Sequence, residues 1–245
     1  MKLSPLTKYL MYQLYQALLL VQKIGPEEEI THLHQFRVAL RRVRSLLELY
    51  TPETIVFPQT LRTFFKTTNP LREFDIFLLS ITPTSHKKVL KRLRSIRKHY
   101  YGEVISEGFK QRLIKALEEF YDFLVELNPA IEQKKLSQTA HEHYRTTLQS
   151  YRALPEKASK KELHALRIRF KVSHYALYFL NEIFQEKVTG KIHVCKQVQD
   201  KLGKIQDLYN QIKWLKQLYH EHPLSEIKTL LVERKKMLKK FKASS

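Results

Sequence analysis

Residues 34–44 read His34-Gln35-Phe36-Arg37-Val38-Ala39-Leu40-Arg41-Arg42-Val43-Arg44, and they interleave two helical patterns. The first cationic stripe, at successive spacings of three, four and three residues, consists of His34, Arg37, Arg41 and Arg44. Such spacings lie on one face of a helix, over roughly 15 Å. An apolar stripe runs one residue behind, at Leu33, Phe36, Leu40, Val43 and Leu47. One residue is about 100° of rotation, so the cationic stripe borders a face that packs against a core.

The same two patterns recur 130 residues later in the chain. The second cationic stripe consists of His164, Arg167, Lys171 and His174. Its apolar companion consists of Leu163, Leu166, Phe170, Ser173 and Leu177, of which only the serine is polar. One such helix alone is typical of a solvated basic face. Because two copies have the same spacing, we infer that a function maintains the stripes.

Helix-breaking residues divide the rest of the chain into eight expected helices. No run of Val, Ile and Thr is bounded by hairpin turns, so the sequence predicts an all-α protein. Four helices are expected in each half, and the short connections predict two four-helix bundles in tandem within a single domain of residues 1–245. The first half covers about residues 5–127 and the second about residues 129–242. The expected helices lie at about 5–23, 26–50, 57–80 and 85–127 (bent near Gly102 and Gly108), then 129–154, 159–189, 190–220 and 223–242.

The charge balance predicts a polyanionic partner. Lys and Arg total 44 against 24 Asp and Glu, a formal net charge of +20. Such an excess repels itself in a compact protein and attracts polyanions. Arginine grips phosphate oxygens with a planar fork, lysine supplies a compact charge, and histidine donates hydrogen bonds. The candidate phosphate-binding residues are His34, Arg37, Arg41, Arg42, Arg44, His164, Arg167, Lys171 and His174.

Two binding hypotheses compete for this charge. A protein that reads or stacks on bases needs Asn, Gln or exposed aromatics among its cations. The stripes contain only Arg, Lys and His, which favours inorganic polyphosphate, with non-specific nucleic-acid binding as the alternative. Charge reversal at Arg37 or Arg167 is expected to weaken binding and leave the helical fold intact, whereas reversal at Lys239 and Lys240 in the basic tail is expected to cost far less. A secondary basic wall is expected at Lys91, Arg94 and Lys98, with a solvated outer face as its alternative.

Motifs of enzymes and metal sites are not found in the sequence. It contains no phosphate-binding glycine loop, nucleophile elbow or His-Glu-x-x-His pattern, so we expect no catalysis, cofactor or metal. Histidines two residues apart split between helix faces and are poorly placed as ligands. The acids Glu73, Asp75 and Asp207 are expected to pair with arginines and orient helices. Cys195 is the only cysteine, and no apolar run approaches the ~20 residues of a membrane span, so we expect a cytoplasmic protein.

These motifs resemble the CHAD family, the conserved histidine α-helical domain. The pattern His-x-x-Arg-Val-x-x-Arg-Arg-x-Arg covers residues 34–44, and His-x-x-Arg-Ile-x-x-Lys covers residues 164–171. The segment Leu202-Gly203-Lys204-Ile205-Gln206-Asp207 is similar to a further motif, and its first-half counterpart lies at residues 69–75. The chain departs from the family pattern with Asn69 for Gly, His174 for Arg and Tyr178 for Glu.

The resemblance implies a fold and a ligand. It implies two four-helix bundles related by pseudo-twofold symmetry around a basic groove or channel that binds inorganic polyphosphate. The implied setting is the cytoplasm, with polyphosphate granules as a further partner.

Overall fold

The computed structural model describes residues 2–26, 28–53, 55–81, 87–155, 158–221 and 223–243, and within these ranges it contains nine helices and no strand. The all-α class is therefore confirmed. The helices are α1 (Pro5–Val21), α2 (Ile30–Tyr50), α3 (Gln59–Leu79), α4 (Lys87–Val104), α5 (Glu107–Leu127), α6 (Gln133–Arg152), α7 (Lys160–Phe184), α8 (Thr189–Glu221) and α9 (Ser225–Ala243).

The single bent helix predicted at residues 85–127 is wrong, because this segment forms α4 and α5. Ser106 caps the second of them: its Oγ accepts a hydrogen bond from the Phe109 amide at 3.2 Å. A capping side chain satisfies an amide that has no partner inside the helix. The serine therefore marks the break, while Gly102 and Gly108 lie inside the two helices.

Other predicted boundaries had mixed outcomes. The second helix begins at Ile30 rather than near residue 26. The helix expected from residue 159 is capped by Ser159, whose Oγ accepts from the Glu162 amide while the Glu162 carboxylate accepts from the Ser159 amide. The predicted start at Ser85 lies outside the described residues. Pro70 lies within α3, which continues through it.

The largest core cluster crosses the boundary predicted between the halves. It gathers side chains of α1, α2, α3 and α5 together with α6 and with Ala176, Phe179 and Leu180 of α7. A second cluster joins α3 and α4 to α8 and α9, and a third joins α6, α7 and α8. The first apolar stripe is at most 1% exposed along its whole length. The hydrophobic effect therefore holds both halves in one shared core.

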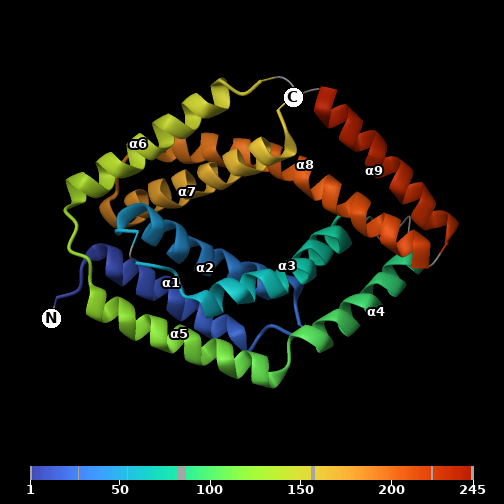
Figure 1. Ribbon diagram of the computed structural model, residues 1–245, viewed down its shortest axis with the longest axis horizontal. Helices are drawn as coiled ribbons and strands as arrows, with labels where there is room; N and C mark the ends of the chain where they lie inside the picture. The colour runs from blue at the N-terminus through green and yellow to red at the C-terminus, as the bar shows by residue number, and fades with distance from the viewer. Residues whose placement is uncertain are drawn as a thin grey trace.

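The helices that carry the two stripes lie near the centre of the molecule (Figure 1). Figure 1 shows α1, α2, α3, α7 and α8 at the centre, with α4, α5, α6 and α9 around them. The helix that carries the first cationic stripe, α2, packs against the helix that carries the second, α7. Next to this contact, α3 packs against α8. This arrangement brings together segments that lie more than 100 residues apart in the sequence.

Candidate functional site

The two stripes meet in a group of charged side chains that we call the central cluster: Arg41 of α2, Arg72 of α3, Arg167 and Lys171 of α7, and Asp207 of α8. Arg41 and Arg167 are close enough that, after burial, their mutual repulsion lowers the pKa of Arg41. Burial and repulsion by Arg41 lower the pKa of Arg72, which Asp207 partly restores. Arg41 therefore repels the other three cations of the cluster, and Asp207 attracts those same three.

Lys171 is the most strongly perturbed cation of the central cluster. Burial, together with repulsion by Arg167 and Arg41, lowers its pKa from 10.5 to about 7. Asp207 opposes this shift, but burial raises the pKa of that carboxyl group as well. At neutral pH the cluster thus holds a lysine that is only partly protonated, which limits the repulsion in the empty site.

His34 lies at one end of the central cluster. Arg72 Nε donates a hydrogen bond to His34 Nδ1 at 3.0 Å, so the ring accepts as a neutral imidazole. Burial lowers the pKa of His34 to about 4, with repulsion by Arg72 and Arg41 acting in the same direction. Burial and the cationic neighbours therefore both favour the neutral form of the histidine.

Arg37 is bound into the fold rather than open to solvent. Its side chain is 5% exposed, and its Nη1 donates to the Phe65 carbonyl oxygen at 3.0 Å and to Thr68 Oγ1 at 2.5 Å. Its Nη2 donates to Asn69 Oδ1, and the guanidinium lies 5.0 Å from the centre of the Phe65 ring. Burial lowers its pKa to about 9. A glutamate here would be buried among acceptors, so in this structure we expect charge reversal at Arg37 to destabilise the fold.

Arg167 is held differently, against a glycine of α8. A Cβ at Gly203 would lie 3.2 Å from Arg167 Nη2 and 3.5 Å from its Nε, so glycine permits this approach. Within the described residues, the buried Nε atoms of Arg167 and Arg41 have no hydrogen-bond partner. Donors that are buried without an acceptor are costly, and a ligand rich in oxygen atoms would satisfy them.

Arg42 and His174 lie together beside the central cluster. Arg42 Nη1 donates to Gln13 Oε1 at 3.2 Å, and its guanidinium lies 5.1 Å from the centre of the Tyr178 ring. The His174 ring stacks on the same tyrosine at 6.2 Å. Burial lowers the pKa of His174, and repulsion by Arg42 acts in the same direction. Two of the three departures from the family pattern, His174 and Tyr178, are thus in mutual contact.

The remaining candidates lie elsewhere. Arg44 pairs with Glu48 at 2.8 Å and is 41% exposed. His164 is exposed beside Arg167 and Gln206 in a small depression between α7 and α8. The predicted wall residues Lys91, Arg94 and Lys98 are exposed. The last two line a hollow of about 600 Å³ against the start of α2 and the end of α3, whose walls are otherwise largely apolar.

Two important residues were not among the predicted ones. Arg72 occupies the position in residues 69–75 that Gln206 occupies in residues 202–207. This correspondence could have identified Arg72 as a candidate from the sequence. Arg97 Nε pairs with Asp75 Oδ1 at 2.9 Å, and Tyr101 Oη donates to Asp75 Oδ2 at 2.6 Å. This geometry confirms the orienting role expected for Asp75. Arg97 follows Leu93 by four residues, so it continues the buried face of α4.

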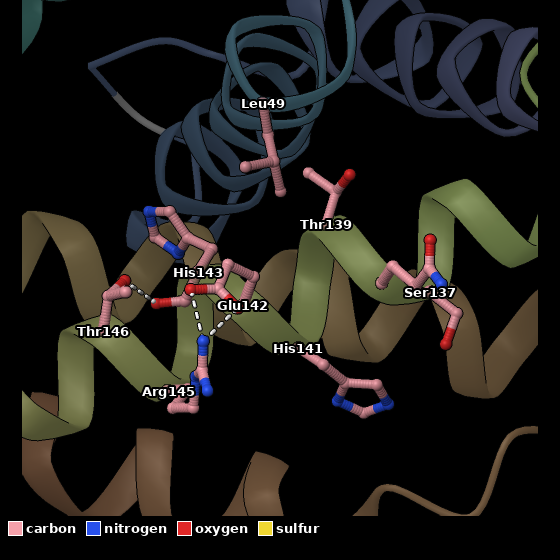
Figure 2. A pocket seen from close by; sticks show the side chains of 9 residues that line it. Leu49, Ser137, Thr139, His141, Glu142, His143, Arg145 and Thr146 are labelled. Atoms are coloured by element: carbon pink, nitrogen blue, oxygen red, sulfur yellow. Dashed lines mark hydrogen bonds and ion pairs between the residues drawn. The ribbon is translucent and has the colours of Figure 1, made fainter.

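A cavity of about 820 Å³ lies apart from both stripes. It is lined by α6 side chains and by Leu49 near the end of α2, and Figure 2 shows that leucine facing them. Arg145 and Glu142 pair at its edge, at 2.6 Å. None of the predicted candidates lines it. We therefore place the candidate site at the central cluster.

A family model for the CHAD domain matches residues 11–216. The chain belongs to the CHAD family. A solved CHAD domain, from the plant Ricinus communis, is similar to this CHAD protein with a TM-score of 0.72 and 19% sequence identity. The match covers 97% of this chain and 90% of that one. At this identity the likeness shows the fold alone. No match was found among curated proteins.

The described part of this CHAD protein lacks two further features. No three His, Cys, Asp or Glu side chains in it gather in a group that could hold a metal ion. None of its described helices is long and apolar enough to cross a membrane.

Proposed function

We propose that this CHAD protein binds inorganic polyphosphate, without catalysis, in a basic groove where α2 and α3 meet α7 and α8. The observation that carries the proposal is the convergence of Arg41, Arg72, Arg167 and Lys171 from two distant stripes. Two of these arginines have a buried Nε without a partner among the described residues. A chain of phosphates supplies both the negative charge and the acceptors that the empty cluster lacks.

The pseudo-twofold relation between residues 5–127 and 129–242 is part of this proposal. Corresponding arginines make corresponding contacts, because Arg37 lies against Asn69 of α3 and Arg167 lies against Gly203 of α8. In each half, therefore, the arginine three residues after the stripe histidine contacts one copy of a repeated segment. The copies are residues 69–75 in the first half and residues 202–207 in the second. A linear polyphosphate fits such a site because its repeating units can contact two similar halves.

The acids of the site support binding without catalysis. Asp75 is already paired with Arg97 and Tyr101. Asp207 lies among Arg167, Arg72 and Lys171, whose charges lower its pKa against the effect of burial. Both carboxylates therefore act as counterions for cations. We further propose the cytoplasm as the compartment and polyphosphate granules as a place of association.

Direct competition tests the proposed ligand. Purified protein is titrated with labelled long-chain polyphosphate, and unlabelled polyphosphate, duplex DNA or single-stranded DNA is added at equal phosphate and equal salt. We expect polyphosphate to compete at least about tenfold better than either DNA, because no bases occupy the space between its phosphates. Equal competition by all three would contradict the proposal and favour general polyanion binding.

Polyphosphate affinity is expected to fall as pH rises from 7 to 9. Lys171 has a pKa of about 7 in the free protein, and a bound polyanion favours its protonated form, so binding takes up a proton in this range. By linkage, affinity falls by up to about tenfold per pH unit. Calorimetric titrations in buffers of different ionisation enthalpy would measure the proton uptake.

The matched control for this pH dependence is Lys171→Arg, which stays charged and should bind with little pH dependence. The empty protein should show the opposite trend. Its unfolded chain binds more protons at Lys171 between about pH 7 and pH 10.5, so this residue makes the folded state more stable as pH rises. Equal pH dependence in wild type and Lys171→Arg would refute this assignment.

A further inference from the structure

The two halves of the CHAD protein hold their corresponding arginines in different ways. Arg37 and Arg167 occupy the same place in their stripes, three residues after a histidine. Each lies against the repeated segment of the next helix, in α3 and α8 respectively. The segments differ in what they offer to a guanidinium.

In the first half, side chains of α3 bind the arginine. Asn69 Oδ1 accepts from Nη2 of Arg37, while Thr68 Oγ1 and the Phe65 carbonyl oxygen accept from Nη1. The Nε atom is buried and has no partner among the described residues. On the edge formed by Nε and Nη2, one of the two edges that can grip a phosphate bidentately, the hydrogen-bond acceptor is therefore Asn69.

In the second half, the positions 134 residues after Thr68 and Asn69 are Leu202 and Gly203, which offer no side-chain acceptor. The edge of Arg167 formed by Nε and Nη2 faces Gly203, since these two atoms lie nearest to the site of the missing Cβ. Within the described residues, the hydrogen bonds leave Nε of Arg167 without a partner. The same edge that is blocked in the first half is thus unoccupied in the second.

We propose that Asn69 keeps Arg37 out of contact with the ligand, so that the site grips polyphosphate asymmetrically, with Arg167 as the contact and Arg37 as a positioning residue. The inference rests on the proposed function. Asn69 thereby sets the affinity, since it occupies the edge of Arg37 that would otherwise take a phosphate. Nη1 stays bound to Thr68 and to the Phe65 carbonyl oxygen, so removing the Asn69 amide would free the edge without releasing the side chain.

The test exchanges the chemistry of the two positions. Asn69→Ala removes the acceptor at an exposed site of α3, where alanine favours the helix. We expect it to tighten polyphosphate binding on the order of tenfold, as one added charge-assisted contact would. Gly203→Asn brings an acceptor to Arg167 and should weaken binding by a similar factor. Gly203→Ala adds a methyl group without an acceptor and should weaken binding less, since the flexible end of Arg167 can yield by a few tenths of an ångström.

A double-mutant cycle separates this mechanism from a change in folding. Lys keeps the charge at position 37 but cannot offer a bidentate edge, so Arg37→Lys should remove the gain of Asn69→Ala. Circular dichroism and thermal unfolding would establish that each variant folds. An unchanged affinity in Asn69→Ala, or a gain that persists in the double variant, would overturn the asymmetry alone. Failure of the wild type to bind polyphosphate would overturn the proposed function and this inference together.

Discussion

Charge reversal at Arg41 or Arg167 is expected to lower polyphosphate affinity by on the order of 100-fold. Each arginine lies in the central cluster with a buried Nε that lacks a partner among the described residues. Each therefore can make charge-assisted hydrogen bonds to phosphate, worth about 1.5–3 kcal/mol apiece. A glutamate also adds a repelling charge. Fluorescence anisotropy with labelled polyphosphate at one salt concentration would measure the loss.

The stability of the empty protein should change in the other direction. Arg41 and Arg167 repel one another and Lys171, so one glutamate relieves repulsion, and we expect the unfolding temperature of Arg41→Glu to stay level or rise. A cluster of like charges that destabilises the empty protein is expected to persist where it is needed for ligand binding. A large fall in unfolding temperature would instead make Arg41 a structural residue.

The matched control reverses charge at Lys239 and Lys240, two exposed residues near the end of α9. The net charge of the double control falls further than that of either single variant. Exposed charges are screened within about 10 Å at 0.1 M salt, so this control should lose much less affinity. If it loses as much as the cluster variants, net charge alone holds the ligand, and the groove hypothesis fails.

Replacing Arg97 with alanine is expected to destabilise the protein by about 3–5 kcal/mol, because it leaves the Asp75 carboxylate buried without its cation. Asp75 is fully buried, and Arg97 is 7% exposed. Arg97 also donates to the Pro26 carbonyl oxygen at 2.8 Å and lies 4.2 Å from the centre of the Tyr101 ring. Its loss therefore disconnects α4 from α3 and from the segment before α2. Guanidinium denaturation followed by circular dichroism would measure the free energy of unfolding.

Arg94→Ala is the matched control, since Arg94 is an exposed arginine on the same helix. A change there should stay within about 0.5 kcal/mol. Adding Asp75→Asn to Arg97→Ala should recover part of the lost stability, because the buried charge is then removed. Equal stability of the Arg97 and Arg94 variants would show that the buried ion pair contributes nothing.

Helical periodicity explains which features could be predicted from the sequence. Hydrogen bonds between residues four apart fix the helix geometry, so spacings of three, four and seven residues define faces without knowledge of the fold. The apolar stripe behind Arg41 is therefore buried as expected, and the cap at Ser159 lies where its local pattern predicts. The same periodicity in two copies also predicted that stripes 130 residues apart belong to one site.

The sequence by itself thus determined most of the helices, their buried faces and the cationic edges beside them, but not the break between α4 and α5. Only the tertiary structure decided which cation has which neighbour. Arg37 and Arg167 are equivalent by spacing, but the first meets Thr68 and Asn69 while the second meets Gly203. Arg42 follows Arg41 directly, yet it donates to Gln13 of α1 and lies over the ring of Tyr178 of α7. The physical reason is that a side chain several ångströms long can reach several partners, and only the packing of neighbouring helices selects among them.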